Sequence, residues 1–293
     1  MGFVEQMKQK QEEINTVLSR YLPKETGEEK LLFEAMNYSV RVGGKRIRPM
    51  LLLETYKMFG GKGEAADPFA TALELIHTYS LVHDDLPAMD NDMYRRGNLT
   101  THAKYGHAMG VLAGDGLLNY AFEIMSEAVC TGGTPEAKAM AILAKKAGVT
   151  GMIAGQVVDV MNTGQPLSKE LLDYINERKT SALICGALMA GAALAGATEE
   201  ELRVLEKIGI CVGLAFQIKD DILDVIGDEA KLGKPVHSDE KNEKNTYVTL
   251  IGIDAAEQTV RKYSEDAVEL LDSLPYNNPF LKQLLISLVT REY

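Results

Sequence analysis

The chain has 293 residues, with 31 basic and 42 acidic side chains and a formal net charge of −11 at pH 7. This charge argues against nucleic acid or an anionic membrane as a non-specific partner, so an anionic ligand has to be bound by local basic groups or by metal. Hydrophobic residues make up 46% and charged residues 25%, which is typical of a globular protein and excludes a disordered chain. No Pro-, Gly- or Ser-rich linker divides residues 1–293, and we expect them to form a single domain.

Two further features concern the compartment. The three cysteines, Cys130, Cys185 and Cys211, show no CxxC pairing and are too few for a disulfide framework, which indicates a reducing, cytoplasmic environment. The segment 1–22 carries charges every few positions and lacks the apolar stretch of a signal peptide. The longest uncharged run, "SALICGALMAGAALAGA" at 181–197, is short and weakly apolar for a membrane span, so we expect a buried helix there.

Helix-forming segments follow one another along the chain, whereas the alternating β-branched runs typical of strands are nearly absent. Helix starts are predicted at Thr26 with Glu29, Asp67 before Pro68, Thr134 before Pro135, Thr198 with Glu201, Asp254 with Glu257, and Asn278 before Pro279. About ten to twelve helices and an all-α fold class are therefore expected. The segment 227–246, rich in glycine and charge, predicts a long surface loop of the kind that is often functional.

The first basic motif is "GGKRIRP" at 43–49, where two glycines end one helix and Pro49 falls near the start of the next. Lys45 and Arg48, close to a helix start, have the chemistry to bind a diphosphate, although an exposed helix-to-helix loop would have the same composition. His77 lies seven residues before Asp84 and on nearly the same helix face, but a lone helical histidine is more often structural.

The segment "LVHDDLPAMDNDMYRRG" at 81–97 gathers four aspartates, a proline and two adjacent arginines. An unbroken helix would point Asp90 about 120° away from Asp84. Pro87 should end the helix that runs through 70–85 and let the chain curl back, so that Asp84, Asp85 and Asp90 converge. Clustered carboxylate oxygens suit Mg²⁺, although a solvated acidic surface is the alternative.

A second cluster, "QIKDDILD" at 217–224, repeats the Asp-Asp pair. In a helix, Asp220 and Asp224 share a face and Asp221 lies to one side. Like charges at this spacing repel each other by about 0.2–0.5 kcal/mol on an exposed helix, and a bound cation would convert that repulsion into affinity. Two such clusters, each ending an apolar helical segment, favour a metal site over a solvated surface.

Together these motifs resemble the trans-isoprenyl diphosphate synthases, also called polyprenyl synthetases, and within them the bacterial farnesyl diphosphate synthases. The resemblance runs over nearly the whole chain, through "GGKRIRP", "HDDLPAMDNDMYRRG", "GQVVDV", "RKTSALI", "FQIKDDILD" and "LGKPV". It implies a single all-α bundle around a central cavity, with isopentenyl diphosphate and allylic diphosphates as substrates and a homodimer as the assembly. The implied reaction is the head-to-tail condensation that releases pyrophosphate.

The resemblance also implies roles for individual residues. Three Mg²⁺ ions would be held by Asp84, Asp85, Asp90, Asp220, Asp221 and Asp224. Isopentenyl diphosphate would be bound by Lys45, Arg48, His77 and Arg96. The allylic diphosphate would contact Arg95, Lys179, Thr180, Gln217, Lys234 and Lys244, of which Lys179, Thr180, Gln217 and Lys234 would be catalytic. Gln156 and Asp159 of "GQVVDV" resemble residues of the same cavity, and the resemblance implies no firm role for them.

Product length is expected to depend on Tyr79 and Ser80, which precede Asp84 by five and four residues. Tyr79 lies about 7.5 Å along the helix from Asp84, where an aromatic ring would form the floor of the tail pocket. An aromatic residue at this place together with the Pro87-Ala88 pair resembles the bacterial farnesyl pattern, which implies a fifteen-carbon product. The alternatives are a geranylgeranyl diphosphate synthase, a terpene cyclase, a non-catalytic synthase subunit, or a core role for Tyr79. The family usually has glycine at His237 and proline at Val248, in and after the loop that carries Lys234 and Lys244.

Overall fold

The computed structural model describes residues 2–226 and 246–290, so Lys234, His237 and Lys244 lie outside the described residues. The described residues form fourteen α-helices, twelve of them eight or more residues long, one π-helical segment and one two-residue hairpin. The expected all-α class is confirmed. The elements are α1 (Phe3–Tyr21), α2 (Lys30–Arg41), α3 (Ile47–Met58), α4 (Asp67–Asp84), β1 (Tyr94–Arg95), β2 (Asn98–Leu99), α5 (Thr101–Tyr105), α6 (His107–Thr131), α7 (Thr134–Ala147), α8 (Met152–Met161), α9 (Lys169–Asn176), η1 (Glu177–Ser181), α10 (Ala182–Leu194), α11 (Glu199–Ile226), α14 (Tyr247–Ile251), α15 (Ile253–Asp272) and α16 (Pro279–Thr290).

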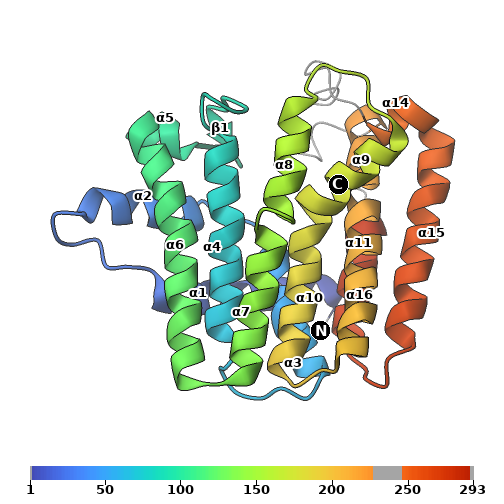
Figure 1. Cartoon of the computed structure of the whole chain (residues 1–293), viewed down its shortest axis with the longest axis horizontal. Helices are drawn as coiled ribbons and strands as arrows, with labels where there is room; N and C mark the ends of the chain where they lie inside the picture. Colours follow the sequence, from blue (N-terminus) through green and yellow to red (C-terminus); the bar gives the residue numbers. More distant parts are fainter. Residues whose placement is uncertain (1, 227–245, 291–293) are drawn as a thin grey trace.

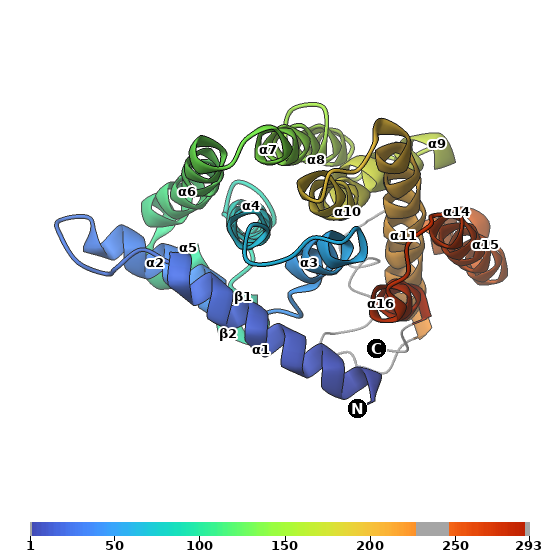
Figure 2. The same ribbon diagram turned by 90° about the horizontal axis from the view of Figure 1, so that it is seen from below.

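The helices form a bundle in which α3, α4 and α10 occupy the interior. Seen from below, α1 and α2 cover one side of these helices, α6, α7 and α8 cover the other, and α11, α15 and α16 close the remaining edge (Figure 2). The helices α4 and α11, which carry the two aspartate clusters, both end at the upper end of the molecule (Figure 1). The bundle therefore brings the two clusters to one end.

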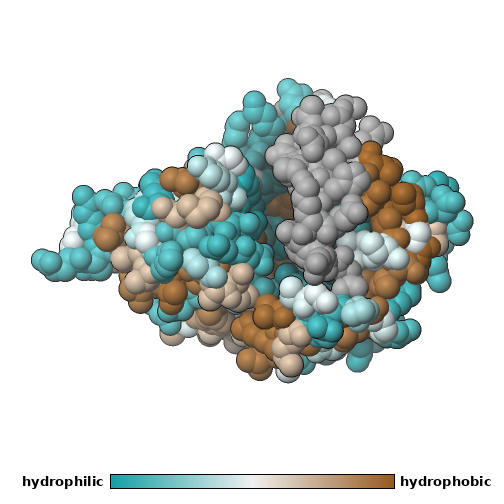
Figure 3. Space-filling view, turned by 90° about the horizontal axis from the view of Figure 1, so that it is seen from above, coloured by the Kyte–Doolittle hydropathy of each residue, from teal (hydrophilic) through white to brown (hydrophobic). Residues whose placement is uncertain are grey.

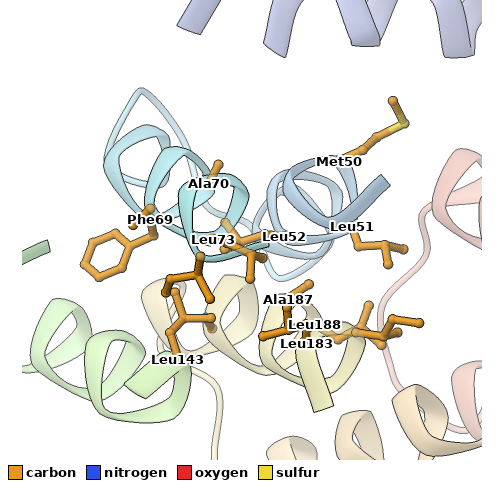
Figure 4. Close-up of a cluster of buried hydrophobic side chains, with 14 of the residues drawn as sticks. Met50, Leu51, Leu52, Phe69, Ala70, Leu73, Leu143, Leu183, Ala187 and Leu188 are labelled. Atoms are coloured by element: carbon orange, nitrogen blue, oxygen red, sulfur yellow. The ribbon is translucent and has the colours of Figure 1, made fainter. Parts of the chain in front are cut away.

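The helix α10 lies in the centre of the core. Within Ala182–Leu194 every residue except Met189 is buried, as expected for the uncharged run at 181–197. Leu183, Ala187 and Leu188 pack against residues of α3 and α4, such as Leu52 and Leu73 (Figure 4). None of the described helices is both long and apolar enough to span a membrane. All three cysteines are free thiols.

The predicted helix starts are mostly confirmed. Thr198 and Glu201 form a reciprocal capping box, and the Asn278 side chain accepts a hydrogen bond from the Leu281 N–H at 3.0 Å. Helices α4 and α7 begin at Asp67 and Thr134 with a proline in the first turn. Two predictions are wrong: α2 begins at Lys30, after a turn with Gly27 at φ 86°, and Gly252 at φ 79°, rather than Asp254, precedes α15.

A buried ion pair fixes the loop between α2 and α3. Arg46, 5% exposed, has a left-handed backbone with φ 53°, which turns its side chain into the protein. Its guanidinium donates to Glu74 Oε1 of α4 at 2.6 Å, to Asn15 Oδ1 of α1 at 2.8 Å and to the Val40 carbonyl of α2 at 2.7 Å. One side chain thus joins four helices and holds the neighbouring Arg48 beside α4.

Removing the carboxylate of this pair should destabilise the whole bundle. We expect Glu74→Gln to lower the free energy of unfolding by about 3–5 kcal/mol, because the Arg46 charge stays buried without its partner. Urea denaturation measures this. The double variant Arg46→Met/Glu74→Leu should recover much of the loss, and Glu200→Gln, which breaks the exposed pair with Arg203, should change little. Equal losses for Glu74→Gln and Glu200→Gln would contradict the assignment.

Candidate active site

The first aspartate cluster lies where α4 ends. Helix α4 stops at Asp84, and Pro87 lies in the turn that follows, as predicted. The backbone N–H of Asp90 then donates to the Asp84 carbonyl at 2.9 Å, and Asn91, with φ 55°, donates to the Leu86 carbonyl. The chain therefore curls back over the helix end and brings Asp90 beside Asp84, which an unbroken helix would keep apart.

Asp85 points in a different direction from Asp84. It is 3% exposed, and Arg95 Nε donates to both of its oxygens at 2.8 and 3.0 Å, with a further contact from the guanidinium at 2.6 Å. Fork-shaped pairing of this kind is strong and directional. Asp85 was expected among the metal ligands, and in the structure it orients Arg95. Arg95 was expected at the allylic diphosphate, and this contact holds it at the edge of the cluster.

The adjacent arginines diverge because of the hairpin that contains them. Arg95 belongs to β1 and pairs with Asn98 of β2, and Arg96 and Gly97 form the two-residue turn with φ 53° and 76°. Positive φ at both central positions is typical of a type I′ turn. Arg96 thereby turns away from Asp85 and donates to the Gly43 carbonyl of "GGKRIRP". Among the described residues, the three non-glycine positions with positive φ are Arg46, Asn91 and Arg96, all within or next to these motifs.

Arg96, Arg48 and His77 form a cation-rich cluster of side chains, which we name the basic pocket. Arg48 lies 3.3 Å from His77 Nε2, and burial lowers the pKa of its guanidinium to about 10, with Arg96 adding to the shift and Glu74 opposing it. Burial, together with Arg48 and Arg96, holds the pKa of His77 well below its usual range, so the ring is neutral. Lys45 is exposed on the same loop. Positive groups crowded in this way favour an anion.

Residues of α8 and η1 interact with the first aspartate cluster. Gln156 Nε2 donates to Asp84 Oδ1 at 2.8 Å, and Lys179 Nζ donates to Asp159 Oδ2 at 2.7 Å. Burial raises the pKa of the Asp84 carboxyl to about 6, an effect that the Lys179 ammonium opposes and the Asp90 carboxylate reinforces. Gln156 and Asp159, for which the resemblance implies no firm role, thus contact Asp84 and Lys179 directly.

Lys179 and Thr180 lie in the π-helical segment η1, a feature that the sequence did not predict. Such single-turn bulges are frequent at functional sites. Two glycines leave room for it: a Cβ at Gly155 would lie 2.4 Å from the Lys179 backbone nitrogen, and one at Gly213 would lie 2.2 Å from Ser181 Oγ. Both distances are far inside van der Waals contact, so α8 and α11 approach η1 closely only because these positions lack side chains.

The second aspartate cluster is joined to η1 by hydrogen bonds. Thr180 Oγ1 donates to Gln217 Oε1 at 3.3 Å, and Gln217 Nε2 donates to Asp221 Oδ1 at 3.2 Å. The other oxygen of Asp221 accepts from the Tyr247 N–H at 2.9 Å. Asp221 and Asp224 are buried and Asp220 is partly exposed. Thr180 and Gln217, which were both expected beside the allylic carbon, therefore lie within hydrogen-bonding distance of each other, and Asp221 is bound by two protein donors.

The carboxylate oxygens fit a magnesium site in chemistry, because Mg²⁺ is commonly bound by one or two carboxylates, waters and substrate phosphates. The crowding of Asp84 with Asp90 supports this fit, since the neighbouring carboxylate disfavours ionisation of Asp84. Across 2–226 and 246–290, no three His, Cys, Asp or Glu side chains are gathered closely enough to hold one ion. The described side chains thus offer separate oxygen donors rather than a closed cage.

The two residues expected to influence product length, Tyr79 and Ser80, lie on α4 below Asp84. Tyr79 is 6% exposed, and its ring packs edge-on against His83 at 5.8 Å between centroids. His83 in turn contacts the Val111 carbonyl of α6 at 3.1 Å, so Tyr79 lies on the side of α4 that faces α6. Ser80 is partly exposed, and its hydroxyl donates to the His77 carbonyl. The molecule is hollowed at its upper end, where α4 and α11 stop (Figure 3).

Comparison with known proteins agrees with this geometry. The family model "Polyprenyl synthetase" matches residues 29–273. The farnesyl diphosphate synthase of Geobacillus stearothermophilus is 45% identical over 267 residues, which are 90% of each chain. The geranylgeranyl diphosphate synthase of Cyanophora paradoxa is 41% identical over 265 residues, 89% of this chain and 87% of that protein.

Solved structures are similar as well. The FPP/GFPP synthase of Zymomonas mobilis superposes with a TM-score of 0.84 at 32% identity, covering 98% of this chain and 97% of that one. The geranyltransferase of Helicobacter pylori, solved with magnesium and isoprenyl diphosphate, superposes with a TM-score of 0.83 at 33% identity over 99% and 97% of the two chains. The chain belongs to the polyprenyl synthetase family and is a prenyltransferase.

Proposed function

We propose that this chain condenses isopentenyl diphosphate with dimethylallyl and then geranyl diphosphate, and releases farnesyl diphosphate and pyrophosphate with the help of Mg²⁺. The observation that carries the proposal is a pair of oppositely charged sites at one end of the bundle. The basic pocket of Arg48, His77 and Arg96 lies within electrostatic range of Arg95, and so does the carboxylate of Asp84. Arg95 links the two, because it is bound to Asp85 while its charge acts on His77.

Two sites of opposite charge suit a reaction between two diphosphates. In the proposal the basic pocket binds isopentenyl diphosphate directly, since guanidinium groups match phosphate oxygens. The carboxylates bind the allylic diphosphate through magnesium, which supplies Lewis-acid stabilisation of the charge that develops on the leaving pyrophosphate. A terpene cyclase, which ionises one diphosphate only, needs no basic pocket of this kind.

The chain's own groups then act on the reacting carbon. The Lys179 ammonium, near Asp84, neutralises part of the charge on the pyrophosphate as the allylic C–O bond breaks. Thr180 and Gln217 form one hydrogen-bonded pair whose oxygens stabilise the positive charge of the allylic fragment. The isopentenyl double bond attacks this cation, and a proton leaves to the pyrophosphate. Lys234 and Lys244 remain predicted contacts of the pyrophosphate. The number of three magnesium ions, the homodimer and the cytoplasmic location also remain predictions.

A fifteen-carbon product is proposed because of Tyr79. The ring is buried about one and a half helical turns below Asp84 and is braced by His83, so it occupies the place where a longer tail would descend. Farnesyl diphosphate synthases at 45% and 42% identity support this product. The geranylgeranyl diphosphate synthase at 41% identity makes a twenty-carbon product the second candidate.

The product assay tests the proposal as a whole. Purified protein is given Mg²⁺ and labelled isopentenyl diphosphate with five-, ten- or fifteen-carbon allylic diphosphates. We expect fifteen-carbon product from the first two primers, little reaction with the third, and loss of all product when the metal is chelated. Twenty-carbon product as the main output would instead establish the second candidate, and no condensation with any primer would refute both.

Tyr79 offers a sharper test of product length. Tyr79→Ser removes the ring, and we expect the main product to lengthen from fifteen to twenty or more carbons, because the space below Asp84 opens. Tyr79→Phe keeps the ring and removes only the hydroxyl, so its product should stay at fifteen carbons. Chromatography of the dephosphorylated alcohols separates these outcomes. An unchanged product length in Tyr79→Ser would return the residue to a core role.

The neutral His77 of the basic pocket predicts a pH dependence of stability. The unfolded chain binds a proton at this histidine near pH 6.5, whereas the native pocket resists it. The unfolded state therefore binds more protons below that pH, and the free energy of unfolding falls as the pH falls from 7 to 5. In His77→Gln this fall should be smaller, as urea denaturation at the two pH values can measure. An equal fall in both proteins would show that the pocket does not perturb His77.

A further inference from the structure

Tyr247 stands out among the buried residues because it contacts two parts of the site at once. It is the first residue of α14 and is fully buried. Its backbone N–H donates to Asp221 Oδ2 at 2.9 Å, and its hydroxyl donates to Asp173 Oδ1 of α9. Asp173 is held from the other side by Lys169 Nζ at 2.7 Å. Tyr247 and Asp173 both lie outside the motifs that carry the family resemblance.

Each of these contacts leads to a different wall of the allylic site. Asp221 lies between Asp220 and Asp224 in the second aspartate cluster of α11. Asp173 lies in α9, which continues without interruption into η1 and therefore into Lys179 and Thr180. The Tyr247 ring itself packs in a core cluster with Leu172 of α9 and Ile218 of α11. One residue thus connects the segment carrying the catalytic lysine and threonine to the helix carrying the carboxylates.

We infer that Tyr247, fixed by Asp173, is a positioning residue that sets the orientation of Asp221 and the distance between η1 and the second aspartate cluster. The inference rests on the proposed function, because it assigns a role within the allylic diphosphate site. The phenol stays protonated and remains a donor, since burial and the Asp173 carboxylate raise its pKa. Loss of the hydroxyl leaves Asp173 without this donor and frees α14 and α9 to shift relative to α11.

The experiment compares Tyr247→Phe, Asp173→Ala and the double variant with the unchanged protein. Binding of pyrophosphate in the presence of Mg²⁺ is measured by calorimetry, well below the unfolding temperature of each protein. Tyr247→Phe should bind roughly fivefold more weakly. The double variant should bind no more weakly than Asp173→Ala alone, because both changes remove the same link. The KM for isopentenyl diphosphate should stay unchanged, since the basic pocket lies on α3, α4 and the β1–β2 turn.

Tyr120→Phe is the matched control. Its hydroxyl donates to the Tyr21 carbonyl at 2.7 Å, so this variant also loses one tyrosine hydrogen bond, but between α6 and the end of α1. It should bind magnesium pyrophosphate normally. Unchanged binding by Tyr247→Phe, additive losses in the double variant, or an equal loss in Tyr120→Phe would each overturn the inference. Absence of condensation by the unchanged protein would instead refute the proposed function, and the binding comparison would still report on Tyr247.

Discussion

The buried ion pair of Arg46 and Glu74 is the interaction on which the arrangement of the basic pocket depends. A charge pair taken out of water contributes stability only when its geometry is good and its remaining donors are satisfied. Arg46 meets this condition with three acceptors on three different helices. Because its backbone is left-handed, the next residues start α3 in a fixed direction, and Arg48 reaches His77 on α4.

Each half of the site holds groups of like charge close together, and the pKa values in the two halves are shifted in opposite directions. On the basic side, burial and neighbouring guanidinium groups lower the pKa values of Arg48, His77 and Arg96. On the acidic side, burial and Asp90 raise the pKa of Asp84. A folded protein tolerates such crowding when the surrounding packing supplies the stability, and bound anions and cations relieve it. The crowded charges therefore indicate the charge of the ligands: an anion for the basic pocket and a cation for the carboxylates.

Much of the fold and the site was predictable from local patterns. The break of α4 before Pro87 follows from the missing N–H and the ring of proline, and the buried α10 follows from its lack of charge. Thr180 and Gln217, which the resemblance assigns to one site, are hydrogen-bonded to each other. The paired roles of Asp85 and Arg95 were not predictable, because sequence spacing does not say which of two adjacent carboxylates a distant guanidinium will bind. The π-helical register of η1 was likewise hidden, since it depends on close approach at Gly155 and Gly213 from two other helices.

The sequence by itself determined the class of the protein, because helical periodicity, two aspartate clusters and a basic loop are local properties. Each of them can be recognised without knowledge of the fold. Tertiary structure alone decided which of those residues meet. Arg46 turns inward, Arg95 and Arg96 separate at a type I′ turn, and Tyr247 joins α14 to both Asp221 and Asp173. These contacts join residues far apart in the chain or depend on backbone angles set by packing, and such information is not contained in the spacing of residues along a single segment.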